Sequence, residues 1–320
     1  MTRWKPRLIL ANLLAEDDLE RLARARDPRY RHRPPSARVL STASRMAVRL
    51  SFFGEPGDRL WLLLDDPPEP AEEVLAWCET PEAAALRTAP RPSAVPLDLP
   101  LPELLWHLPV PAPSVVAEVH HRGFALRVAQ DLGCALPGAR MVDSPAELDR
   151  MLTERGAPPA WVVKAPFSAA GRSRYIEREG PLLCDEKSRR TVENLFDRHG
   201  PLLFEPWLDR LADWGCSALL TADGLRIVGI HRQRVDLKGQ FAGIELETKD
   251  LPEGDRKRLE EVVTGVATTL RQAGYVGPFG VDAWHWRRPD GTVAFHPLGE
   301  INARMTFGLV EWASLDRLQG

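Results

Sequence analysis

Apolar positions along the chain come in short runs whose length and period predict a mixture of strands and helices. In residues 7–66 the runs RLILANLL, ARVLST and RLWLLLDD alternate with polar, Arg-rich stretches, and one of these, DDLERLARAR, has the spacing of an amphipathic helix. This alternation is typical of an α/β domain. The segment 67–113 differs, because its 12 prolines in 47 residues disfavour continuous helices and central strands. We therefore expect an extended surface connection with short helical turns there, and a domain boundary at its end.

The pattern after the proline-rich segment predicts an α+β arrangement. One helix is expected to end at Gly133, and a second to begin at Ser144, which precedes a proline. A strand AWVVKAPF, a tight loop SAAGRSR and a strand PLLFEPWL follow, and then a hairpin that turns at Asp223-Gly224. A helix over 253–273 leads into a second hairpin, in which FGVDAWHW and VAFHPLGEINAR flank the turn RRPDGT.

Composition and charge narrow the class of protein. The 320 residues are about twice a typical domain of roughly 150, so two or three subdomains are expected. Hydrophobic residues make up 44% and charged residues 27%, as in globular proteins, and the net charge of -3 gives no overall field for nucleic acid or an anionic membrane. No apolar stretch approaches the length of a membrane helix. The four cysteines lie far apart without metal-ligand spacing, so a reducing cytoplasm is the expected location.

The second hairpin brings oxygen ligands together. Counted outward from the turn, Asp282 falls roughly opposite Glu300, while Glu300 and Asn302, two apart on one strand, project to the same face. Carboxylate and amide oxygens suit Mg²⁺ and leave coordination positions for nucleotide phosphates. A polar solvent face of an edge hairpin is the alternative, but the apolar flanks and the following Arg304 favour a metal site.

Residues 300–304, Glu-Ile-Asn-Ala-Arg, resemble the ExNxR end of the ATP-grasp superfamily, in which the acid and the Asn hold magnesium and the Arg faces the acyl substrate. The segment Trp-Val-Val-Lys164-Ala-Pro-Phe-Ser168-Ala-Ala-Gly171 resembles the strand lysine and the small-residue phosphate loop of that family. Small residues leave backbone N–H groups accessible to phosphate, and the lysine neutralises charge. Lys164 is one of only six lysines beside 36 arginines, which favours this interpretation over an ordinary hairpin carrying one lysine.

Three further segments match the family by position. Leu-Leu-Phe-Glu205-Pro-Trp207-Leu208 is similar to the adenine hinge, where main-chain groups contact the adenine edge. The resemblance implies that Asp213 binds ribose hydroxyls, although a surface turn acid fits that position equally well. Arg122 begins a helix where the family commonly has its first phosphate lysine, and an arginine can bind phosphate with two N–H groups.

The resemblance covers roughly residues 114–310 and implies a combined α/β and α+β fold. A small N-terminal α/β domain, 1–112, would precede an ATP-grasp domain, 113–320, whose two α+β subdomains clasp ATP. The central subdomain, about 142–204, would act as the lid.

The activity implied by the resemblance is ligation that uses ATP with Mg²⁺, or Mn²⁺ as an alternative. A carboxylate becomes an acyl phosphate and an amine displaces the phosphate. Arg304 would hold the carboxylate, and Lys238 would contact the γ-phosphate from a substrate loop, unless it is a solvated turn lysine. The expected partners are a small carboxylate and an amine, amino acids and peptides included, without nucleic acid or membrane; a homodimer stays open. An ATP-grasp kinase and a non-catalytic nucleotide-binding regulator are the alternatives.

Overall fold

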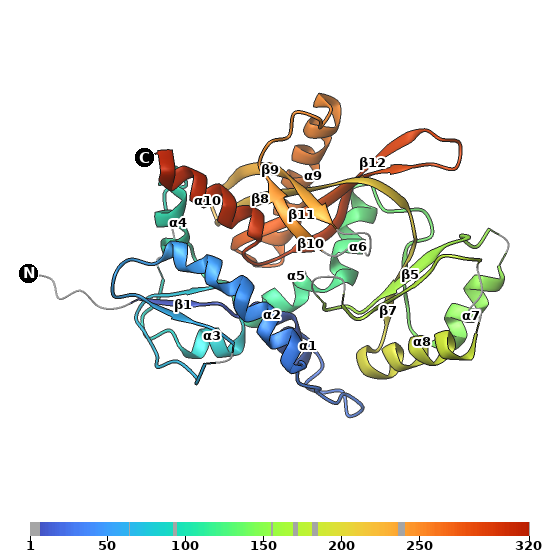
Figure 1. Ribbon diagram of the computed structural model, residues 1–320, viewed down its shortest axis with the longest axis horizontal. Coiled ribbons are helices and arrows are strands. Elements are labelled where there is room, and N and C mark those ends of the chain that lie inside the picture. The colour runs from blue at the N-terminus through green and yellow to red at the C-terminus, as the bar shows by residue number, and fades with distance from the viewer. Residues whose placement is uncertain are drawn as a thin grey trace, which may run out of the picture.

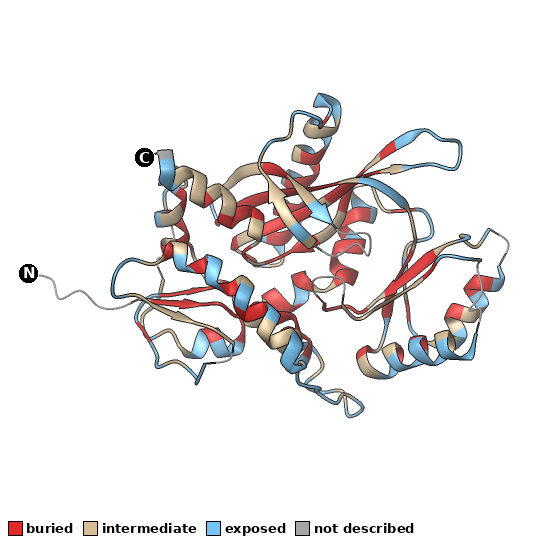
Figure 2. Ribbon diagram, viewed as in Figure 1, coloured by how far each residue is buried: buried red, intermediate tan, exposed pale blue. Residues whose placement is uncertain are grey.

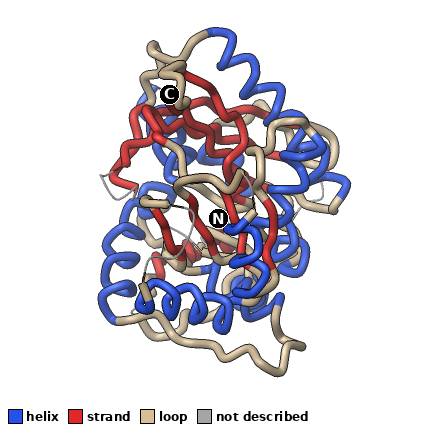
Figure 3. Tube along the Cα trace, turned by 90° about the vertical axis from the view of Figure 1, so that its right-hand side faces the viewer, coloured by secondary structure: helices blue, strands red, loops and turns tan. Residues whose placement is uncertain are grey.

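The computed structural model describes the chain from Arg7 to Gln319 except for short gaps, and its described ranges are 7–63, 65–91, 95–154, 156–168, 172–180, 185–235 and 241–319. These residues form three sheets with helices around them (Figure 1). When the molecule is turned by 90°, the strands lie toward its middle and most helices lie outside them (Figure 3). Within the described ranges, no helix has both the length and the apolar character needed to cross a bilayer.

The N-terminal sheet is parallel. β1 (Leu8–Leu10) lies between β2 (Arg59–Trp61) and β3 (Val74–Ala76). The helices of this part are α1 (Ala15–Ala23), α2 (Ala37–Ala47), the 3₁₀ helix η1 (Val48–Phe53) and α3 (Pro81–Ala85). The apolar run ARVLST belongs to α2, because the Ser36 side chain accepts a hydrogen bond from the Val39 amide and caps a helix there.

The proline-rich segment is more ordered and more buried than the extended surface connection expected from its composition. It contributes β3 to the sheet edge and α4 (Leu101–His107) to the core, where Leu104 is fully buried. The prolines are compatible with these elements because they stand where helices begin, as Pro81 does in α3 and Pro102 does in α4.

A second, antiparallel sheet forms the small subdomain, which we define as residues 140–206. Its strands, in spatial order, are β4 (Arg140–Val142), β7 (Leu202–Pro206), β5 (Trp161–Lys164) and β6 (Arg174–Glu177). α7 (Pro145–Thr153) and α8 (Glu186–His199) pack on it and enclose a hydrophobic cluster of its own (Figure 2). The Ser144 hydroxyl accepts a hydrogen bond from the Glu147 amide, which confirms the predicted helix start. This subdomain brackets the range expected for a lid.

The large sheet is antiparallel and contains both predicted hairpins. Its strands, in spatial order, are β10 (Phe241–Glu245), β9 (Leu225–Val235), β8 (Asp209–Leu220), β11 (Gly277–Arg287) and β12 (Val293–Asn302). The helices packed around it are α5 (Pro113–His120), α6 (Arg122–Asp131), α9 (Glu253–Gln272) and α10 (Phe307–Gln319). Its hydrophobic cluster continues into the N-terminal part, since Ile9 and Trp77 belong to the same cluster as Val262 and Phe279.

Candidate functional site

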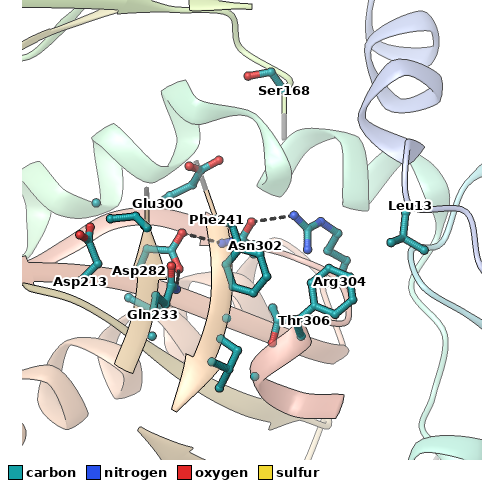
Figure 4. A pocket seen from close by; sticks show the side chains of 18 of the residues that line it. Leu13, Ser168, Asp213, Gln233, Phe241, Asp282, Glu300, Asn302, Arg304 and Thr306 are labelled. Atoms are coloured by element: carbon teal, nitrogen blue, oxygen red, sulfur yellow. Dashed lines mark hydrogen bonds between the residues drawn. The ribbon is translucent and has the colours of Figure 1, made fainter. Parts of the chain in front are cut away.

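A cleft of about 710 Å³ lies against one face of the large sheet. Its lining comes from the N-terminal part, the small subdomain and the large sheet together. The cleft brings together eight residues singled out from the sequence: Arg122, Lys164, Ser168, Asp213, Asp282, Glu300, Asn302 and Arg304. Residues that are far apart in the chain therefore share one site (Figure 4).

The predicted pairing in the second hairpin is confirmed, because Asp282 on β11 lies opposite Glu300 on β12, beyond a register shift between Asp282 and Trp284. The Asp282 carboxylate accepts hydrogen bonds from Asn302 Nδ2 at 3.1 Å and from Gln233 Nε2 at 2.7 Å. Burial and the neighbouring Glu300 charge raise the pKa of Asp282 to about 6. Among the described residues, no three His, Cys, Asp or Glu side chains lie close enough together to hold a metal ion. The possible metal ligands here are therefore the two carboxylates of Asp282 and Glu300 and the amide oxygen of Asn302. A hard cation fits this set, since it would offset the repulsion between the two acids.

Gln233 belongs to the site although its sequence context gives no sign of it. It lies on β9, and its amide reaches across β8 to Asp282 on β11. This reach depends on Gly215 of β8, because a Cβ atom there would stand 2.8 Å from Gln233 Nε2 and 2.3 Å from His231 Nε2. Gly215 directly faces Asp282 across the ladder of β8 and β11, a pairing that the sequence alone does not give.

Arg122 joins the hairpin of β11 and β12 to the small subdomain. Its Nη2 donates to Glu300 Oε1 at 2.8 Å, and its Nη1 donates to Ser168 Oγ at 2.8 Å and to the Ala165 carbonyl at 2.5 Å. Its Nε is buried and has no acceptor among the described residues. The cation at the start of α6 thus lies where β5, the loop after it and β12 meet.

Lys164 and Glu205 form a buried ion pair, with Lys164 Nζ 2.5 Å from Glu205 Oε2. Burial lowers the pKa of Lys164. Burial would raise the pKa of Glu205, but the charge and hydrogen bond of Lys164, together with the Arg210 charge, hold that pKa below its usual value. Lys164 lines the cleft, whereas Glu205, Trp207 and Leu208, expected in an adenine hinge, do not. Glu205 is turned to the lysine, and the Trp207 ring lies 5.1 Å from the Arg178 guanidinium.

Two of the remaining predictions fall on residues that the structure does not describe. Gly171 and Lys238 lie outside the described ranges, so their phosphate roles stay predictions. Asp213 lines the cleft and pairs with Arg210, whose Nη1 is 3.0 Å from Asp213 Oδ1. The Arg210 guanidinium is also 3.6 Å from the centre of the Trp284 ring.

Arg304 is held by the N-terminal part. Its Nε donates to Glu16 Oε1 at 2.9 Å and its Nη2 to Asn302 Oδ1 at 3.1 Å, so Asn302 links Asp282 to Arg304 (Figure 4). Burial would raise the pKa of Glu16, but Arg304 and His120 outweigh it and the pKa lies well below its usual value. Burial would lower the pKa of Arg304, but the Glu16 charge raises it. The sequence offers no signal for Glu16, which looks like one acid in a polar turn.

Comparisons with known proteins were made by sequence and by structure. No protein-family model matches the chain, and no curated protein matches it. Among solved structures, N5-carboxyaminoimidazole synthetase from Staphylococcus aureus complexed with ADP aligns with a TM-score of 0.51 at 12% identity, over 82% of this chain and 68% of the other. D-alanyl-alanine synthetase A from Vibrio cholerae gives 0.47 at 13% identity, over 70% of this chain and 73% of the other.

The biotin carboxylase complex from Campylobacter jejuni gives a TM-score of 0.48 at 15% identity, over 64% of this chain and 48% of the other. The chain spans about half the length of this enzyme, and 50% of an N5-carboxyaminoimidazole ribonucleotide synthetase bound to ADP. At these identities the likeness concerns the fold alone.

Proposed function

Because the chain has the ATP-grasp fold, we propose that it is an ATP-dependent ligase that joins a carboxylate to an amine. The observation that carries the proposal is the convergence of Asp282, Glu300 and Asn302 with Arg304 in one cleft. That cleft also holds the cations Arg122 and Lys164. Oxygen ligands for a metal, cations for phosphates and a separate arginine for an acid are the groups that this reaction requires.

Asp282, Glu300 and Asn302 would hold Mg²⁺, with Mn²⁺ as the alternative. When bound, the metal would screen the negative charge that accumulates on the γ-phosphoryl group during transfer. In the structure Arg122 pairs with Glu300, and Asn302 turns its oxygen to Arg304. We infer that the amide and the Arg122 side chain shift their hydrogen bonds when the nucleotide binds.

A carboxylate is a poor electrophile, and its conversion into an acyl phosphate would make its carbon reactive toward an amine. A carboxylate oxygen, oriented by Arg304, would attack the γ-phosphorus while the bond from that phosphorus to the bridging oxygen breaks and ADP leaves. The amine nitrogen would then attack the acyl carbon and lose a proton to solvent, and phosphate would leave with the former carboxylate oxygen. Lys164 and Arg122 would neutralise the nucleotide phosphates at the opposite side of the transferring group.

The test is a screen of pooled carboxylates and amines for phosphate release from ATP with Mg²⁺. A ligase releases phosphate only when both an acid and an amine are present. Formation of ADP without any requirement for an amine would instead indicate a kinase, and ATP binding without turnover would indicate a regulator. Either outcome would overturn the ligase proposal.

Once substrates are found, Glu300→Gln and Asn302→Ala should lower kcat by about 100-fold or more, because metal position matters most in the transition state. Both variants should keep the circular dichroism spectrum of the parent. The surface variant Glu261→Gln on α9 is the matched control, and its kcat should not change. Near-parental rates in both site variants would show that the hairpin is only structural.

A further inference from the structure

The end of the cleft beyond Arg304 has an apolar lining, which we call the apolar wall: Trp77, Phe241, Phe307, Val39, Met46 and Ile244. The centre of the Phe307 ring is 4.8 Å from that of Trp77 and 5.6 Å from that of Phe241, so the three aromatic rings are continuous. Phe241 and Phe307 are only partly buried. Apolar side chains left partly open inside a cleft indicate an apolar ligand group.

This wall begins beside the arginine that would hold the acid. The Arg304 guanidinium carbon is 5.3 Å from the centre of the Trp77 ring, and the Met305 amide donates to the Trp77 carbonyl at 2.9 Å. Each terminal nitrogen of Arg304 makes one hydrogen bond within the described chain, to Asn302 or Met305, and has a second N–H group for a ligand. A carboxylate on Arg304 would therefore place the rest of its molecule against the wall.

The charges around this end disfavour an ammonium group. Three carboxylates line the cleft among the described residues: Asp213, Asp282 and Glu300. They lie on β8, β11 and β12, and none belongs to the apolar wall. Glu16 is fully buried and already paired with Arg304. An ammonium group next to the substrate carboxylate would find no described anion at the wall and would lie near a fixed cation, which costs free energy.

We propose that the acid substrate carries a bulky apolar group, aromatic or branched aliphatic, and no ammonium group beside its carboxylate. This inference rests on the proposed function for the place of the acid. It adds the chemical class: the carboxylate binds Arg304, the apolar group covers the aromatic rings of the wall, and a free α-amino acid is a poor substrate.

The experiment compares three probes that differ by one feature each: 3-phenylpropanoate, L-phenylalanine and propanoate. Their dissociation constants are measured by ligand-observed NMR titration of the full chain, with and without ADP and Mg²⁺. 3-Phenylpropanoate should bind at least about tenfold more tightly than either of the others, since it alone has the ring without the ammonium group. Equal or tighter binding of phenylalanine would overturn the proposal.

Two variants on different elements tie the binding to the wall. Phe307→Ala, at the start of α10, and Phe241→Ala, on β10, should each weaken 3-phenylpropanoate by about tenfold, while ADP binding does not change. Phe295→Ala is the control, because Phe295 is a partly buried aromatic residue of β12 that does not line the cleft. Unchanged affinity in both wall variants would overturn the inference. If the parent protein does not bind ADP but still binds the three acids in the expected order of affinity, the proposed function is overturned and this inference is not.

Discussion

Arg304 combines a fixed position with N–H groups left for a ligand, because Glu16, Met305 and Asn302 each accept one hydrogen bond from a different guanidinium nitrogen. Arg304→Lys should keep ATP affinity and raise KM for the acid by about 10- to 100-fold. A lysine keeps the charge but not the paired N–H groups, and such a contact contributes about 1.5 to 3 kcal/mol. Separate titrations of ATP and acid check this. An ATP defect as large as the acid defect would assign Arg304 to the nucleotide or to the fold.

Lys164 forms an ion pair with the buried Glu205 and is expected to bind the nucleotide phosphates as well. Lys164→Ala should weaken binding of ATP with Mg²⁺ by at least about tenfold and also lower the free energy of unfolding by about 3 kcal/mol, because Glu205 is left buried and unpaired. The double variant Lys164→Met with Glu205→Gln should recover stability but not ATP affinity. Calorimetry and urea unfolding separate the two effects. Parental ATP affinity in the double variant would remove Lys164 from the nucleotide site.

The side chains that the sequence identifies are those whose neighbours are close in the chain. Asp282 and Glu300 could be assigned to one face in advance because side chains alternate along a strand, but the register shift between Asp282 and Trp284, which places the two acids directly opposite each other, could not be predicted. Glu16 could not, because its partner Arg304 is 288 residues away and meets it only after the N-terminal part packs on the large sheet. The hinge prediction for Trp207 rests on its position in the order of motifs and concerns main-chain groups, so it stays a prediction.

At the scale of elements, strand β8 leaves room for the hydrogen bond between Gln233 and Asp282, because Gly215 has no side chain. Gly215→Ala should push Gln233 away from Asp282, because the added Cβ would stand within 2.8 Å of the glutamine amide. Overpacking of this kind costs about 1 to 3 kcal/mol of stability, and we expect kcat to fall by about tenfold as well. Gly243→Ala on β10 is the control, since nothing lies within 4 Å of its added Cβ. Equal effects of both variants on kcat would contradict this role of Gly215.

Elements with strong local signals agree with the sequence prediction. The helix predicted over 253–273 is α9, and both hairpins form at their predicted turns. The segment 67–113 differs because its outcome depends on context: packing against α10 and β3 orders α4 within it. Composition alone reports how many prolines there are, but not that several of them begin helices.

At the scale of the whole molecule, α1 of the N-terminal part touches α8 of the small subdomain. Glu20 Oε1 and His199 Nδ1 lie 2.7 Å apart, and Arg24 Nη1 donates to the Arg198 carbonyl at 2.6 Å. Both Glu20 and His199 are buried. Together with Arg122, which binds the loop after β5, these contacts link the small subdomain to the N-terminal part and the large sheet.

This arrangement predicts that the contacts of α1 hold the small subdomain closed. Glu20→Ala combined with Arg24→Ala should increase the radius of gyration of the nucleotide-free protein in small-angle X-ray scattering. Each lost hydrogen bond to a charged group shifts the equilibrium toward the open form by about 1.5 to 3 kcal/mol. The control is Arg189→Ala, which removes an ion pair to Asp149 inside the small subdomain and leaves α1 untouched. If the double variant and the control have the same radius as the parent, Arg122 and the packing of β5 suffice for closure, and the α1 contacts only follow it.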